Sequence, residues 1–146
     1  MQIEIKIDSS YTEPKIVILT AVMSEDVSRV LNKLSENTPQ ILSGCKNEKV
    51  EVIEQEDLIR VYANAGKVFA STSKGEYMIR LRLYEIEERL HPNQFIRISN
   101  SEIINLKRVK NFDLSFTGTI CVELDNHITT YVSRRYVSKI KKILGI

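Results

Sequence analysis

Apolar and polar side chains alternate at the start of the chain, where isoleucine takes every second position of the opening segment MQIEIKID. A period of two places these isoleucines on one face, so residues 2–7 are predicted to form a strand. Lys15–Thr20 is predicted as a second strand. The turn between the two contains Pro14, which cannot donate a hydrogen bond to a strand ladder.

The apolar period becomes helical over Met23–Leu34, where four residues at i, i+3, i+4 and i+7 share one face: Val27, Val30, Leu31 and Leu34. Ser24 is expected to cap this helix, with acidic residues in the first turn where the helix dipole favours them. The Asn-Thr-Pro segment at residues 37–39 is expected to end it. The pattern therefore predicts a β-β-α leader over residues 1–39 and a second domain over residues 40–146.

Short strands separated by turn residues dominate the second domain, which predicts a mainly β, overall α+β, fold. The predicted strands are Ile41–Lys46, Val50–Glu54, Leu58–Tyr62, Lys67–Ser71, Glu76–Arg80, Phe95–Ser99, Ile103–Phe116, Thr119–Leu124 and Ile128–Val132. Two segments return to helical spacing. One is Leu83–Leu90, stopped by Pro92, and the other runs from a Ser133 cap to Leu144.

The length of 146 residues fits one domain, or one domain with a small appendage. The longest apolar run, Ile16–Leu19, is far too short to span a membrane. The alternating N-terminus also lacks the basic start and continuous apolar core of a signal peptide. These features predict a cytoplasmic protein.

Residue types that carry catalytic or metal chemistry are scattered along the chain. There is no CxxC pair and no Cys/His cluster, so no metal site is expected. Because a Gly-rich phosphate loop and a Ser-His-Asp arrangement are also missing, an enzyme is the least favoured class and no cofactor is expected. Cys45 and Cys121 are interpreted as small buried hydrophobes in a reducing compartment, with a disulfide as the alternative.

Charge is distributed unevenly although the net charge is only +2. Residues 97–146 hold nine Lys and Arg against four Asp and Glu, whereas the rest of the chain holds twelve against fifteen. A basic C-terminal third is typical of a surface that meets nucleic acid, although a solvated basic face would give the same count.

The segment Phe95–Lys110, FIRISNSEIINLKRVK, combines these signals. An apolar-alternating strand enters the polar turn Ser99-Asn100-Ser101, and a second apolar run leads to a basic cluster that includes Lys107 and Arg108. Arg and Asn can each make two hydrogen bonds to a base edge, while Lys and Arg can bind phosphates. The turn could therefore read a nucleic-acid groove. An ordinary strand–turn–strand with solvated charges is the competing interpretation.

The order of residues in this segment resembles the signature of the LytTR DNA-binding domain, and the resemblance extends over about residues 40–146. It implies small β-sheets whose loops, in place of a recognition helix, enter DNA grooves. It further implies double-stranded DNA as the partner, commonly as direct repeats bound by two protomers, and no small-molecule substrate. Family members usually carry a receiver domain, but only about 39 residues precede the signature domain here. The chain thus resembles stand-alone LytTR regulators.

The resemblance implies three DNA-facing loops. The first carries Asn64, Gly66 and Lys67. Gly66 would permit positive φ, and Lys67 could reach phosphate or base. A plain hairpin turn is the alternative interpretation of Asn64 and Gly66. The second is the signature turn, where Asn100 takes the base-contacting position and Ser99 stands where many members have His. The third begins the last helix, where Arg135 takes the position of a base-reading Arg and Arg134 is a candidate phosphate contact.

Other residues of the signature are assigned supporting roles. Arg97 and Ser101 are expected to hold or cap the turn, and Arg97 could also touch phosphate. For Lys107 and Arg108, phosphate contact and simple solvation are equally favoured. Asn105 is expected to be buried, with its amide satisfying backbone groups of the sheet.

Besides the enzyme, three function classes follow from these observations. A sequence-specific double-stranded DNA-binding transcription regulator, acting as a homodimer, is the leading hypothesis. A protein-interaction module that responds to a small membrane protein, without direct DNA binding, is the alternative. RNA binding is weaker, since no aromatic platform is evident in the signature turn. The leader is either a structural cap or a dimer or partner surface.

Overall fold

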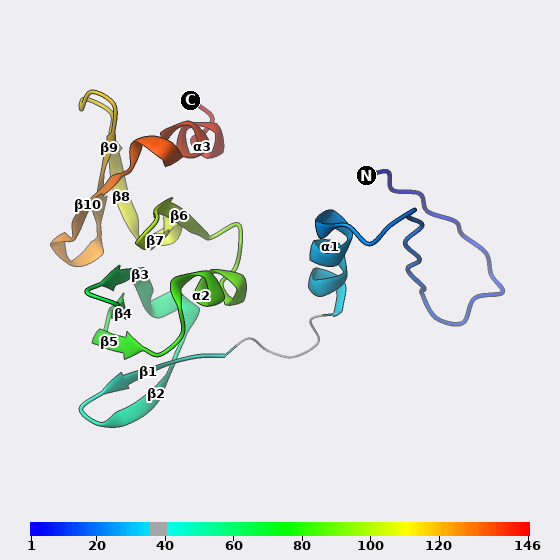
Figure 1. Ribbon diagram of the computed structural model, residues 1–146, viewed down its shortest axis with the longest axis horizontal. Helices are drawn as coiled ribbons and strands as arrows, with labels where there is room; N and C mark the ends of the chain where they lie inside the picture. The colour runs from blue at the N-terminus through cyan, green and yellow to red at the C-terminus, as the bar shows by residue number, and fades with distance from the viewer. Residues whose placement is uncertain (36–40) are drawn as a thin grey trace. The chain divides into compact units, whose positions relative to one another are not determined.

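The computed structural model describes residues 1–35 and 41–146, and it divides the chain into two units, Met1–Pro39 and Gln40–Ile146 (Figure 1). None of the helices within the described ranges is long and apolar enough to cross a membrane.

In the first unit, the predicted helix is confirmed as α1 (Glu25–Ser35). The Ser24 hydroxyl accepts a hydrogen bond from the Val27 backbone N–H at 3.4 Å, which confirms Ser24 as the cap. The end predicted at residues 37–39 lies outside the described residues.

The two strands predicted for the leader were wrong, because residues 2–7 and 15–20 form no strand (Figure 1). Their apolar side chains lie in solvent: Ile3 is 90% exposed, Ile5 81% and Ile7 96%. A period of two shows that a segment is suited to a sheet but does not supply the partner. An isolated two-stranded hairpin is marginal in water unless something covers its apolar face. The predicted β-β-α leader is therefore a helix preceded by irregular chain.

Seven antiparallel strands of the second unit form one sheet in the order β2-β1-β5-β4-β3-β7-β6. Their bounds are β1 (Leu42–Lys46), β2 (Lys49–Ile53), β3 (Leu58–Asn64), β4 (Lys67–Thr72), β5 (Gly75–Ile79), β6 (Phe95–Ser99) and β7 (Glu102–Asn105). The β3–β4 turn has positive φ at Ala65 (50°) and Gly66 (77°). Such a turn matches the twist of a hairpin, and glycine adopts positive φ without strain, as the sequence predicted for Gly66.

A second sheet has three strands in the order β10-β9-β8: β8 (Val109–Asp113), β9 (Ile120–Leu124) and β10 (Thr129–Val132). The single strand predicted over Ile103–Phe116 was wrong, since it is divided between the two sheets. The division falls at Asn105, whose side-chain Oδ1 accepts a hydrogen bond from the Lys107 backbone N–H at 3.0 Å. This bond closes the short 3-10 turn Leu106–Arg108 and redirects the chain.

Two hydrophobic clusters stabilise the second unit. Helix α2 (Leu83–Arg89) contributes Leu83 and Ile86 to the first cluster. Helix α3 (Arg134–Leu144) contributes Ile140 to the second, which joins β6 and β7 to the small sheet. Both helices bury one face, as their helical spacing predicted. The two cysteines are free and half-buried, so full burial was wrong for them.

Asn105 is fully buried, as predicted. Its Nδ2 donates to the Leu58 backbone oxygen at 2.7 Å, and its Oδ1 also accepts from Gln94 Nε2 at 3.3 Å. This one amide therefore connects β3, β7 and the segment before β6.

Candidate nucleic-acid interface

The three loops expected to face DNA are joined by hydrogen bonds at one end of the strands. The Ala63 backbone N–H, beside the β3–β4 turn, donates to the Ser101 oxygen at 2.8 Å. The Ser133 backbone N–H, at the start of α3, donates to the Ile98 oxygen at 2.9 Å. We call residues 64–67, 99–101 and 133–135 the loop face.

Arg97 holds the turn between β6 and β7 from within. Its guanidinium donates to the backbone oxygens of Ser99 (2.7 Å) and Asn100 (2.6 Å) and to a Glu87 carboxylate oxygen (2.7 Å). The Arg97 side chain is only 16% exposed. Its donors are therefore committed to the turn and to α2, which fits the predicted supporting role.

A serine hydroxyl also supports this turn, but at a different position from the one predicted. The Ser101 backbone N–H donates to the Ser99 hydroxyl at 3.2 Å, so Ser99 supplies the cap and the cap assigned to Ser101 was wrong. The two hydroxyls lie 3.3 Å apart. A residue two positions before an N–H is well placed to accept its bond, which explains the exchange of roles.

Asn100 is exposed at the tip of the turn. Its side-chain oxygen accepts a hydrogen bond from the Tyr136 hydroxyl at 3.3 Å, which links the turn to α3. Within the part of the chain that the structure describes, the Nδ2 group of Asn100 has no hydrogen-bond partner. The amide is thus oriented through its oxygen while its nitrogen can donate outward, for example to an acceptor on a base edge.

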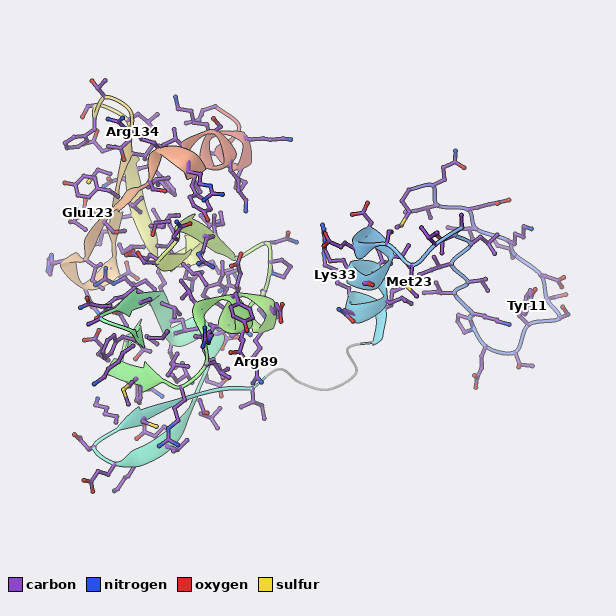
Figure 2. The ribbon with its side chains drawn as sticks, in the orientation of Figure 1. Tyr11, Met23, Lys33, Arg89, Glu123 and Arg134 are labelled. Carbon is purple, nitrogen blue, oxygen red and sulfur yellow. The ribbon has the colours of Figure 1, made fainter. Side chains whose placement is uncertain are left out.

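The cations of the loop face are exposed: Lys67, Arg134 and Arg135. No carboxylate among residues 1–35 and 41–146 forms an ion pair with them. Figure 2 labels Arg134 at the start of α3, and a side chain built at Gly118 would come within 3.5 Å of its Nε. Gly118 therefore lies beside this arginine, at a distance where a Cβ atom would make an ordinary van der Waals contact.

The start of α3 breaks a local rule of helices. The helix dipole favours acids in the first turn, yet this turn has none and begins with Arg134 and Arg135. Ser133 occupies the N-cap position with no hydrogen bond from its side chain, so the predicted side-chain cap was wrong. Two arginines beside the positive end of a helix are favourable once an anion binds there, because backbone N–H groups and guanidinium groups would share it.

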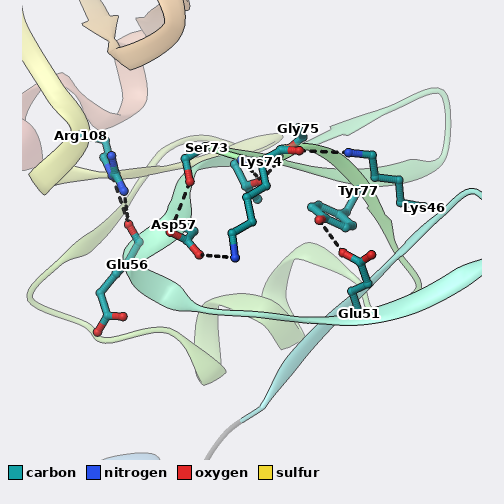
Figure 3. Close-up of polar contacts among 10 residues, drawn as sticks. Lys46, Glu51, Glu56, Asp57, Ser73, Lys74, Gly75, Tyr77 and Arg108 are labelled. Atoms are coloured by element: carbon teal, nitrogen blue, oxygen red, sulfur yellow. Dashed lines mark hydrogen bonds and ion pairs between the residues drawn. The ribbon is translucent and has the colours of Figure 1, made fainter.

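Lys107 and Arg108 are not part of this surface. They follow the opposite end of β7 from Ser101, about 15 Å away at strand rise. The Arg108 guanidinium donates to the Glu56 backbone oxygen at 2.5 and 3.1 Å, as Figure 3 shows, and lies 3.4 Å from an Asp125 carboxylate oxygen. Arg108 thus has a structural role in these contacts, while Lys107 is exposed.

A buried carboxylate lies directly behind the loop face. Glu102 is 9% exposed, and its Oε1 is 3.5 Å from Arg60 Nη1 and 3.1 Å from the Thr130 hydroxyl. Its Oε2 has no partner among the described residues. Burial raises the pKa of the Glu102 carboxyl, against the lowering effect of Thr130 and Arg60. These contacts join β3, β7 and β10.

Glu102 and Tyr136 are absent from the set of residues predicted from the sequence. For Glu102 a signal was available, since it is followed directly by the two apolar residues Ile103 and Ile104 of a predicted strand. Tyr136 gave no such signal, because its contact with Asn100 spans 36 positions and depends on how α3 packs.

Comparison with known proteins identifies the family of this chain. The family model described as the LytTr DNA-binding domain matches residues 48–145. A solved LytTr DNA-binding domain from Bacillus cereus superposes with a TM-score of 0.69 at 22% identity, over 73% of this chain and 97% of that one.

Curated relatives match along the whole chain, leader included. Proteins of Staphylococcus aureus strains NCTC 8325 and N315, both named HTH-type transcriptional regulators, are each 33% identical over 147 residues, covering 100% of this chain and 99% of the relative. Despite that name, the three helices of the described residues are widely separated in sequence, and no two are joined by a tight turn. The chain belongs to the LytTr DNA-binding domain family.

Proposed function

We propose that this protein is a sequence-specific transcription regulator that reads double-stranded DNA through the loop face. The observation that carries the proposal is the joining of three distant loops into one surface that exposes the Asn100 amide and unpaired cations. Membership of the family and the names of the Staphylococcus aureus relatives support it.

The residues predicted from the sequence have different roles in this proposal. Asn100 and Arg135 read base edges. Lys67 and Arg134, with the first backbone N–H groups of α3, bind phosphates. Asn64 contributes a polar contact from the β3–β4 turn. Arg97, Ser99 and Ser101 position Asn100, and Lys107 and Arg108 lie at the flank.

In this proposal the protein acts in the cytoplasm and binds direct repeats as a homodimer. The leader is its candidate dimer surface, because it exposes the alternating Ile3, Ile5 and Ile7. The same exposure favours a second candidate function, in which the leader docks on a small membrane protein and the chain acts as an interaction module without direct DNA binding.

Selection of bound duplexes from a random pool tests the function directly. The enriched duplex should bind the full chain more tightly than a random duplex does. The affinity of both should fall with salt, because phosphate contacts release counterions. Lys67→Ala and Arg134→Ala should each weaken both duplexes about equally, with Lys107→Ala as a matched control from outside the loop face. Failure to enrich any duplex would leave the interaction module as the better account.

A further inference from the structure

A hollow of about 690 Å³ opens beside the β3–β4 turn. Its walls come from that turn, from the end of β5 and from the connection between β5 and α2. The polar and aromatic residues of its lining are Lys67, Arg80, Arg82, Tyr84 and Arg97. We call this surface the basic hollow.

The charge of the basic hollow is one-sided. It is lined by four cations, and no carboxylate is among the described residues that line it. Arg97 is committed to the signature turn and to Glu87. Lys67, Arg80 and Arg82 are exposed, and within residues 1–35 and 41–146 their side chains have no acidic partner. Three exposed cations that line one hollow, none of them in an ion pair within the described residues, favour an anionic ligand there.

Core packing fixes the direction of the two arginines. Leu81, which stands between them, packs against the first hydrophobic cluster. Its burial leaves Arg80 and Arg82 facing outward. The Tyr84 side chain, 59% exposed, offers an amphipathic ring at the same rim. The hollow thus combines an apolar lining with cations and one aromatic edge, and the cations suit the phosphates of a nucleic-acid backbone.

Lys67 belongs both to the basic hollow and to the loop face. The hollow therefore continues the surface on which Asn100 and Arg135 lie. We propose that the basic hollow binds the phosphate backbone of the same duplex whose bases the loop face reads. This inference rests on the proposed function and extends the DNA contact to Arg80 and Arg82, neither of which the sequence pattern singled out.

The double variant Arg80→Gln, Arg82→Gln in the full chain tests the inference. The matched control is Lys49→Gln, Lys74→Gln, which removes the same charge at the opposite end of the sheet, where Lys74 lies 3.7 Å from Asp57 (Figure 3). Affinity is measured for the selected duplex and for a random one between 50 and 200 mM salt. Thermal melting of each variant checks that it is folded.

Loss of two phosphate contacts should weaken both duplexes by the same factor and lower the salt slope by about 1.8 units. The ratio of the wild-type affinity to the variant affinity should therefore fall about tenfold between 50 and 200 mM salt. The control should keep the wild-type slope. The inference would be overturned if the Arg80/Arg82 variant kept the wild-type salt slope. It would also be overturned if the control variant lost as much affinity and salt slope as the Arg80/Arg82 variant.

Two further outcomes separate this inference from the proposed function. The wild type could show no sequence preference while its binding to random duplexes still depends on Arg80 and Arg82. That result would refute sequence-specific reading by the loop face but would leave the phosphate-binding inference intact. Titration with inorganic phosphate distinguishes a small-anion site from a backbone site. Phosphate binding that needs both arginines, combined with unchanged duplex affinity in the double variant, would reassign the hollow to a free phosphate compound and overturn the inference.

Discussion

Asn100 is the residue whose chemistry is most closely tied to its surroundings. Arg97 holds its backbone oxygen at 2.6 Å, and the Tyr136 hydroxyl holds its side-chain oxygen at 3.3 Å. A side chain fixed in this way loses little conformational entropy when it binds a base. Arg135 is exposed on the first turn of α3 and offers a two-pronged donor for the same duplex.

Asn100→Ala and Arg135→Ala should each reduce the free energy of specific binding by about 1–3 kcal/mol. Both side chains are exposed, so the melting temperature should hardly change. Titration of the selected duplex with each variant measures the loss, and Tyr136→Phe tests the hydroxyl that orients Asn100. The assignment as base readers fails if neither alanine variant weakens the selected duplex.

Asn105 is an asparagine like Asn100, but it is buried and stabilises the fold. Replacing it with alanine leaves the Leu58 oxygen and the Lys107 N–H without their partner. We expect Asn105→Ala to lower the free energy of unfolding by about 2–4 kcal/mol, as measured by urea denaturation. Gln94→Ala removes only the 3.3 Å contact and should cost much less. Equal losses in the two variants would show that the backbone bonds of Asn105 contribute little.

At the scale of elements, Glu102 connects β3 and β7 of the large sheet to β10 of the small one. Because burial raises the pKa of its carboxyl above the ordinary 4.5, the folded protein binds this proton more tightly than the unfolded chain does. The resulting stabilisation is complete below pH 4.5 and is lost as the pH rises through the raised pKa.

Glu102→Gln removes this titration. The free energy of unfolding of the variant relative to the wild type should therefore increase as the pH is raised from about 4.5 towards neutrality. Urea unfolding at several pH values measures the difference, and Glu88→Gln, an exposed carboxyl on α2, is the control. A difference that stays constant with pH would contradict a raised pKa in the folded state.

Local pattern was sufficient for most elements of the second unit. Strands β1, β3, β4, β5 and β6 and both of its helices follow their apolar periods, because each buries one face against a cluster within the same unit. Strand β2 also forms where its alternation predicts, although Val50 and Val52 are exposed and only Ile53 reaches the first cluster. The local pattern failed where a side-chain hydrogen bond ended a strand that the apolar alternation would have continued. This happens at Asn105, whose bond to the Lys107 backbone N–H ends β7. It also failed at residues 2–7, where the period is perfect but no neighbouring strand covers it.

At the scale of the whole molecule, some residues of the candidate site could be predicted from local sequence and others could not. The turn residues 99–101 were evident because they are consecutive in sequence. Arg80 and Arg82 were not, since only the folding of β5 beside β4 brings them next to Lys67. The engagement of Arg108 with Glu56 was likewise hidden, because 52 positions separate the two residues.

The leader exposes apolar side chains, among them Ile3, Ile5 and Ile7. Residues 1–39 hold six Asp and Glu against four Lys and Arg, so this segment is poorly suited to touch DNA. Both hydrophobic clusters of the second unit are formed by residues after position 40. The second unit therefore has its own core, and the exposed leader isoleucines are available to pair with a second copy.

A protein of residues 40–146 should then bind a single half-site like the full chain but sediment as a monomer. It should also lose cooperative binding to a double site, because linked protomers bind the second half-site at a raised effective concentration. In the full chain, serine at Ile3, Ile5 and Ile7 should have the same effect. Serine at the intervening Gln2, Glu4 and Lys6 is the control, because it leaves the apolar positions and the net charge unchanged. A truncated protein that still self-associates and binds the double site like the full chain would exclude the leader as the dimer surface and favour docking on another protein.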